Sequence, residues 1–216
     1  MLDGLTLSSS STLAPDDIRL TTGMTSGGNA KLNLMYGLAN DLQLEIPIEQ
    51  FGNYDRLPDS ETFGNAIKFG AGAKLRFLNQ AQGDPFSLSV KVKGVRDSKR
   101  PRVGTLFAEV PIVYQNNDKT ALFLNPKIAF YRKEERLGLG LGINQVLSDK
   151  LQLIGELTPV SGQELIWSTG LRYFEPGADL GIDIYASNTS GQNSIGGLVA
   201  DTTTNIGFNV HWLFRL

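Results

Sequence analysis

Apolar and polar residues alternate along most of this chain, and this alternation is the feature that most limits its fold. In residues 67–77, for example, apolar side chains such as Phe69 are separated by polar or small ones such as Lys68. The same period of two recurs in residues 41–48, 86–93, 137–143 and 206–214. Successive side chains of a β-strand point to opposite faces, so a run of about 8–12 such residues indicates a strand. Its repetition over the whole chain predicts an all-β fold.

Turn-forming residues divide the chain into twelve such runs. We expect strands at roughly residues 17–25, 30–38, 41–50, 63–78, 86–95, 103–115, 119–132, 136–146, 150–159, 165–174, 179–187 and 204–216. Short polar breaks alternate with breaks of more variable length, and this asymmetry is typical of barrels with short turns on one rim and longer loops on the other. The sequence therefore predicts a single antiparallel up-and-down transmembrane β-barrel of about twelve strands over residues 17–216. Residues 1–16, rich in Ser and ending near Pro15, are predicted to form a flexible lead-in.

The composition of the two strand faces favours a membrane barrel over a soluble sandwich. The polar face holds many glycines beside Lys, Arg and Glu, which suits a wet lumen better than a surface exposed to bulk water. Aromatic residues on the apolar face fall near strand ends, as in interfacial girdles. They are Tyr36, Phe77, Phe86, Tyr114, Tyr173, Trp212 and Phe214 near the short turns, and Phe63, Phe130 and Trp167 near the longer loops.

The residue inventory excludes several classes of site. The chain has no cysteine, one histidine and a net charge of −2, so we expect no disulfide, no Cys-ligated metal and no nucleic-acid partner. No metal-ligand spacing is present, and we predict no cofactor. His211 has no Ser nearby on its own strand face, and Glu109 and Glu156 lack a spacing signature, so wall positions are favoured over catalytic ones. We therefore predict that the protein is not an enzyme.

Three stretches carry a resemblance to a known family. They are "LRFLNQAQGDPFSLSVKVKGVRDSKR", "LFAEVPIVYQNNDKTALFLNPKIAFYRKEERLGLGLGINQVLSDKLQLIGEL" and "WSTGLRYFEPGADLGIDIYASN". With their strand, turn and Leu-Gly patterns, residues 17–216 resemble transporter-like bacterial outer-membrane barrels of the MetA-pathway of phenol degradation family. The resemblance implies an outer-membrane barrel and a channel as one possible activity, and it supplies no catalytic residues. One departure is that the chain ends on Leu216, where such barrels usually end on an aromatic residue.

Strand parity predicts which charged residues point into the lumen. Eleven basic residues would do so: Arg19, Lys31, Lys68, Lys74, Arg76, Lys91, Lys93, Lys127, Arg136, Arg172 and Arg215. Five acidic residues would join them: Glu45, Glu49, Glu109, Glu156 and Asp183. The predicted interior charge is eleven minus five, or +6. Lys68, Lys74, Arg76, Lys91 and Lys93 lie on two consecutive strands and would form one basic wall, with Glu45 and Glu49 close enough to pair across strands.

These features predict an integral protein of the bacterial outer membrane that acts as a channel for passive diffusion of small, anionic solutes. Its pore would be lined by Lys68, Lys74, Arg76, Lys91, Lys93, Lys127 and Arg172, with the five acidic residues as their partners. The expected partners are the lipid bilayer, lipopolysaccharide, small solutes and the outer-membrane assembly machinery. The main alternative is a plugged accessory barrel that anchors a larger envelope assembly. A membrane-embedded enzyme and a soluble ligand-binding barrel are further alternatives.

Overall fold

The computed structural model describes residues 3–51, 67–98, 104–131, 134–191 and 194–215. Its strands are β1 (Ile18–Thr25), β2 (Ala30–Ala39), β3 (Leu42–Gln50), β4 (Ile67–Leu78), β5 (Ser87–Asp97), β6 (Gly104–Glu109), β7 (Ile112–Asn117), β8 (Thr120–Tyr131), β9 (Glu134–Ser148), β10 (Leu151–Thr158), β11 (Ile166–Glu175), β12 (Leu180–Thr189) and β13 (Ala200–Phe214). Three 3₁₀ turns complete the described elements: η2 (Gln80–Gln82), η3 (Pro176–Ala178) and η4 (Ser194–Leu198). None of the described helices is long and apolar enough to cross a membrane.

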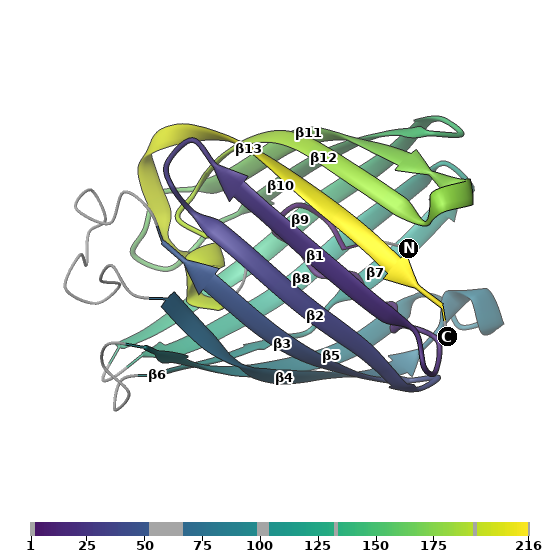
Figure 1. Cartoon of the computed structure of the whole chain (residues 1–216), viewed down its shortest axis with the longest axis horizontal. Helices are drawn as coiled ribbons and strands as arrows, with labels where there is room; N and C mark the ends of the chain where they lie inside the picture. The colour runs from purple at the N-terminus through teal and green to yellow at the C-terminus, as the bar shows by residue number, and fades with distance from the viewer. Residues whose placement is uncertain (1–2, 52–66, 99–103, 132–133, 192–193, 216) are drawn as a thin grey trace.

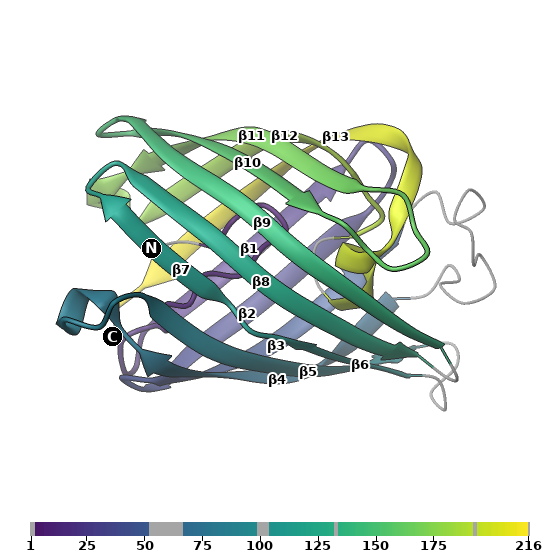
Figure 2. The same ribbon diagram turned by 180° about the vertical axis from the view of Figure 1, so that it is seen from behind.

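The strands close into one barrel (Figures 1 and 2). Every strand pairs antiparallel with its neighbours, and β1 closes the ring against β13, with Thr21 opposite His211. Strands β6 and β7 each pair with both β5 and β8, so they are two parts of one interrupted wall strand. The wall therefore has twelve strands, and the predicted all-β, single antiparallel up-and-down barrel is confirmed.

The wall strand breaks where a proline removes a ladder donor. Strand β6 ends at Glu109 and β7 begins at Ile112, with Pro111 between them. The neighbouring strands still hold this point, because Val110 N donates to Pro126 O at 2.9 Å and Ser89 N donates to Pro111 O at 3.0 Å. The wall therefore stays closed across the interruption.

Strand positions follow the sequence pattern closely, and the differences concern strand ends. Strand β9 extends past both predicted ends, and β13 begins at Ala200 instead of residue 204. Both strands gain length at the long-loop rim, where residues continue the ladder without continuing the apolar alternation. Predicted strand residues 63–66, together with Phe63, lie outside the described residues.

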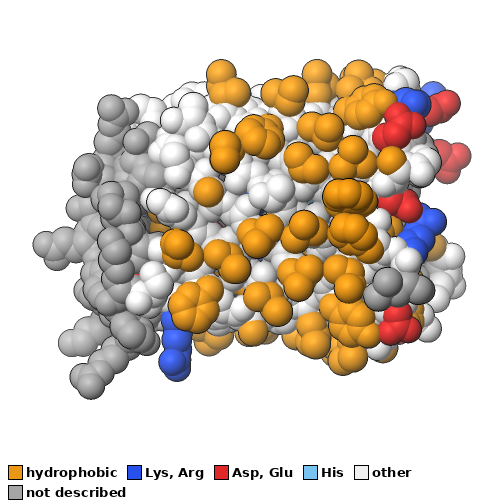
Figure 3. Space-filling model, in the orientation of Figure 1, with side chains coloured by type: hydrophobic (Ala, Val, Ile, Leu, Met, Phe, Trp, Pro, Cys, Tyr) orange, Lys and Arg blue, Asp and Glu red, His pale blue; other side chains and the backbone are white. Residues whose placement is uncertain are grey.

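Hydrophobic side chains form a band across the outer face of the barrel that Figure 3 shows. The outward side chains of Ile184 and Ile206 are 64% and 65% exposed, far more than a soluble core would allow. Aromatic residues mark the short-turn end, where the rings of Trp212 and Phe214 stack with centroids 5.0 Å apart. Charged side chains gather at that same rim in Figure 3. This arrangement is the apolar band and aromatic girdle of a barrel embedded in lipid.

Two segments occupy the inside of the barrel. Residues 3–14, here called the plug segment, form no helix or strand and enter at the short-turn end, where Thr12 Oγ1 donates to Asn40 O at 2.7 Å. At the opposite end the connection between β12 and β13, here called the inward loop (described residues 190–191 and 194–199), is buried. Both segments are visible within the barrel in Figures 1 and 2.

Candidate functional site

The lumen wall carries the charged residues that strand parity assigned to it. Eleven of the twelve predicted lining residues are at most 5% exposed, and the remaining one, Arg76, lies at the short-turn rim, where it binds Asp41 at 2.7 Å. The eleven are Lys68, Lys74, Lys91, Lys93, Lys127, Arg172, Glu45, Glu49, Glu109, Glu156 and Asp183. Because the outer face is apolar and exposed, these buried charges point to the interior.

The parity assignment needs two corrections and three additions. Arg76 belongs to the rim, and so does Arg215, which lies beyond the end of β13 with its side chain 67% exposed and bound to Asp179 at 2.7 Å. Asp97 and Asp201 are 3% and 4% exposed, and the plug segment adds Asp3. Asp97 and Asp201 fall outside the strands predicted at 86–95 and 204–216, so strand parity assigns neither of them. The described lumen therefore holds nine basic and eight acidic residues, a net charge of +1.

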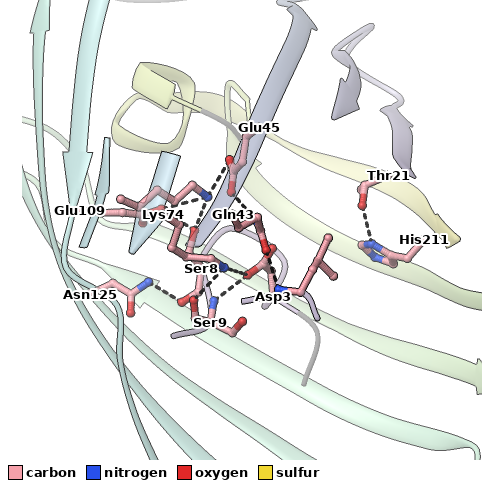
Figure 4. A network of polar contacts seen from close by, with 12 residues as sticks. Asp3, Ser8, Ser9, Thr21, Gln43, Glu45, Lys74, Glu109, Asn125 and His211 are labelled. Carbon is pink, nitrogen blue, oxygen red and sulfur yellow. Dashed lines mark hydrogen bonds and ion pairs between the residues drawn. The ribbon is translucent and has the colours of Figure 1, made fainter. Parts of the chain in front are cut away.

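A lysine–carboxylate cluster forms the centre of the predicted basic wall (Figure 4). Glu45 on β3 accepts salt bridges from Lys91 and Lys93 on β5, each at 3.3 Å. The pairing reaches across β4 because the intervening residue is Gly72, where a Cβ would lie 2.7 Å from the Cγ of Lys93. Lys91 also binds Glu109 at 3.3 Å. The predicted cross-strand ion pairs thus join β3 and β5, which are not adjacent, and Gly72 on the intervening strand β4 leaves room for the side chains to meet.

A second network surrounds the single histidine. Arg172 binds Asp183 through Nε at 2.6 Å and Nη2 at 2.9 Å, and His211 Nε2 lies 2.8 Å from the same carboxylate. His211 Nδ1 lies 3.1 Å from Thr21 Oγ1, on the neighbouring strand (Figure 4). The sequence pattern along the strand of His211 does not reveal this hydroxyl, because Thr21 lies on the adjacent strand β1. Because Asp183 is held by two bonds from Arg172 and Thr21 is buried, the row of groups stabilises the closing seam of the barrel.

Wall side chains bind the main chain of the plug segment. Glu156 accepts hydrogen bonds from Leu5 N at 2.6 Å and Thr6 N at 2.7 Å. Lys127 Nζ donates to Thr6 O at 3.0 Å, and Asn125 Nδ2 donates to Ser8 O at 2.8 Å. These partners satisfy backbone groups that would otherwise be buried without a bond.

The plug segment also brings a negative charge to the basic wall. Lys74 Nζ lies 3.9 Å from the Asp3 carboxylate, and Arg172 Nη1 donates to Asp3 O at 2.8 Å. Burial raises the pKa of the Asp3 carboxyl, but Lys74, Lys91 and Arg19 outweigh burial and hold that pKa well below its usual range. Asp3 is therefore an anion that occupies the basic wall.

A row of glycines on β9 leaves space for these inner segments. A Cβ at Gly140 or Gly142 would lie 2.4 or 2.7 Å from the methyl carbons of Leu7, which packs with Val113 and Phe123. At Gly138 it would lie 2.5 Å from a methyl carbon of Leu198 in the inward loop. The Leu-Gly alternation therefore has a structural reason on its inner face: close approach of another chain segment.

The inward loop packs through an apolar cluster. Its residues Ile195, Leu198 and Val199 join a buried group with wall residues Phe51, Phe107, Ala129, Tyr131, Val160, Ile166 and Ala200. Ser194 Oγ donates to Glu49. Between the inward loop and the plug segment, a cavity of only about 40 Å³ is left. That is space for roughly one water molecule, so the described residues close the lumen in this conformation.

In the described part of the chain, no group of three or more His, Asp or Glu side chains is placed to hold a metal ion. The structure thus defines a closed barrel with an apolar exterior, an aromatic rim and a charged interior. A chain of this kind is an integral β-barrel of the outer membrane. This chain belongs to the family described as uncharacterised conserved protein UCP029691, whose model matches residues 59–204. No curated protein matches the chain.

Solved structures with a similar fold are outer-membrane porins. The KdgM porin is 13% identical, with a TM-score of 0.67 over 92% of this chain and 99% of that one. The NanC porin is 9% identical, with a TM-score of 0.61 over 92% and 100%. Omp33 of Acinetobacter baumannii is 12% identical, with a TM-score of 0.51 over 92% and 97%. The comparisons support an outer-membrane barrel, and the matching family model differs from the MetA-pathway family that the sequence resembles.

Proposed function

We propose that this barrel is a channel for passive diffusion of small anionic solutes across the outer membrane. The observation that carries the proposal is the wall of lysines and arginines, which exceed the acidic residues of the described lumen by one. Fixed positive charge in a narrow, weakly screened passage favours anions. The fold gives independent support, since the similar KdgM porin was also solved in complex with oligogalacturonate.

Passage through this lumen requires the plug segment to leave it. Its contacts are hydrogen bonds to wall side chains such as Glu156, Lys127 and Asn125, which water can replace, and two small apolar clusters around Leu5 and Leu7. The inward loop is held by a larger apolar cluster, which water cannot replace without cost. We therefore expect the plug segment to be the displaceable part of the closure and the inward loop to remain as a constriction.

Removal of the plug segment also strengthens the anion preference. The lumen loses the carboxylate of Asp3, so its net charge rises from +1 to +2, and Lys74 loses an ion-pair partner. The cations of the wall then face the solute instead of a built-in anion.

The closed lumen supports a second candidate, an accessory barrel that stays plugged and anchors a larger envelope assembly. The bonds that hold residues 3–14 inside are the observation that favours it. Contacts with lipopolysaccharide and with the outer-membrane assembly machinery belong to both candidates and remain proposals, as does membership of the MetA-pathway family.

Planar-bilayer conductance under a salt gradient separates these candidates. We expect the full chain to be mostly closed and a variant lacking residues 3–12 to conduct steadily, with a zero-current potential of anion-selective sign. A cation-selective sign would refute the anion channel. A deletion variant that is folded and silent would leave the accessory barrel as the better proposal.

A further inference from the structure

A cavity at the short-turn end has no role in the closure described above. It has a volume of about 380 Å³ and is lined by strands from β7 round to β13 and by β1. At about 30 Å³ per water molecule, it holds roughly a dozen waters. This volume lies in the range of small-molecule sites.

Arg19 is the cation of this cavity that has a buried donor without a hydrogen-bond partner among the described residues. Arg172 and Arg215 also line it, but they bind Asp183 and Asp179, and Lys119 is exposed on the β7–β8 turn. Arg19 forms no hydrogen bond or salt bridge within the part of the chain that the structure describes, and its Nε is buried. A buried guanidinium donor without a partner is costly, and a carboxylate satisfies it through two parallel bonds.

An acceptor without a partner lines the same cavity. Asn144 is 6% exposed, and its Nδ2 donates to Gln152 Oε1 at 3.2 Å. Its Oδ1 is buried and has no hydrogen-bond partner among the described residues. The cavity thus offers one donor group for an anion and one acceptor for a hydroxyl, from β1 and β9 respectively.

Apolar side chains supply the rest of the lining. Phe174, Val146, Leu213 and Ala121 face this space and suit the carbon skeleton of a ligand, with Phe174 available for ring contact. Two rim carboxylates, Asp118 and Asp179, disfavour a second negative charge. The lining therefore fits a monoanion with an apolar body better than a polyanion.

We infer that this cavity binds small hydroxylated ring monocarboxylates, with the carboxylate on Arg19, the ring against Phe174 and the hydroxyl on Asn144. The inference rests on the proposed channel function, because it names the solute class that enters from the short-turn mouth. No plug-segment residue lines the cavity, so the site is complete while the lumen is closed.

The test uses the detergent-solubilised full chain and titration calorimetry with four probes. They are 4-hydroxybenzoate, benzoate without the hydroxyl, 4-hydroxybenzamide without the charge, and the dianion terephthalate. We expect 4-hydroxybenzoate to bind most tightly, benzoate several-fold more weakly, and the other two more weakly still. Equal binding of all four probes would overturn the inference, because it would show nonspecific partitioning into detergent or cavity.

Two substitutions test the contact of Arg19 with the carboxylate and the contact of Asn144 with the hydroxyl. R19Q should weaken 4-hydroxybenzoate by about 10- to 100-fold, since hydrogen bonds to charged groups contribute about 1.5–3 kcal/mol. R76Q is the matched control, because Arg76 lies on the same rim but outside this cavity. N144L should abolish the advantage of 4-hydroxybenzoate over benzoate. Equal weakening in R19Q and R76Q would reduce the effect to general electrostatics and overturn the site.

The experiments distinguish failure of the proposed binding site from failure of the proposed channel function. Absence of binding at millimolar probe, in a protein whose plug-deleted form conducts anions, overturns the site and leaves the channel. Specific binding by a chain that stays silent in bilayers with or without residues 3–12 keeps the site and overturns the channel. Circular dichroism of each variant confirms that the compared proteins are folded.

Discussion

The plug segment should leave the lumen more often when its best wall anchor is weakened. In Glu156→Gln, the amide keeps one acceptor oxygen but turns an NH₂ group toward donors that the carboxylate now accepts, Leu5 N and Thr6 N at 2.6 and 2.7 Å. Loss of one such bond, with two donors left facing each other, costs about 2–3 kcal/mol. The ratio of released to seated plug should therefore rise by about 30- to 150-fold.

Single-channel recording measures this ratio as open time over closed time. Glu49→Gln is the matched control, because Glu49 is an equally buried lumen carboxylate that contacts Ser194 of the inward loop. A variant without residues 3–12 gives the fully released level. Equal ratios of open to closed time in Glu156→Gln and Glu49→Gln, with a conducting deletion variant, would refute this prediction. A wild type that already conducts at the level of the deletion variant would refute it as well.

Three further substitutions test the lipid-facing surface, a lumen ion pair and the fit of the plug segment. Ile184→Arg places a cation on the lipid face near the middle of β12 and should destabilise the barrel by about 2–4 kcal/mol in urea titrations in vesicles, whereas an unchanged midpoint would argue against lipid contact. Asp183→Asn leaves the buried Arg172 without its carboxylate and should cost about 3–5 kcal/mol in the same titration, and an unchanged midpoint would contradict the buried ion pair. Gly140→Leu should expel Leu7 and raise conductance, and adding Leu7→Ala should restore closure. Absence of this rescue would contradict the fit of the plug segment to the glycine row.

The wall of this barrel was largely predictable because its physics is local. Each strand must present apolar side chains to lipid and polar ones to the lumen, so period two marks both the strand and its inward face. Strand parity in the sequence therefore assigns residues such as Lys93 and Glu45 to the interior without any knowledge of their contacts. Their pairing distance was less predictable, since it depends on Gly72 leaving a gap between two non-adjacent strands.

The plug segment was harder to predict because its partners are distant in sequence. Residues 3–14 have no periodicity, and their bonds go to side chains as far apart as Gln43 and Arg172. The Ser-rich composition of this stretch, considered without its partners, predicts a solvated N-terminal segment. The prediction that it is flexible stays a prediction, and the recordings described above measure how often it leaves.

The signal for an inner segment lay in the wall itself. A strand of a wide barrel gains nothing from glycine on its inner face unless something approaches the backbone closely, because glycine costs conformational entropy and packs poorly. Gly140 and Gly142 meet Leu7 of the plug segment, while Gly138 meets Leu198 of the inward loop. One glycine row thus serves a segment held by hydrogen bonds and two small apolar clusters and another held by a larger apolar cluster. Because water competes for the hydrogen bonds of the plug segment, and because its apolar clusters are the smaller ones, we expect the row to mark the boundary between the removable and the permanent half of the closure.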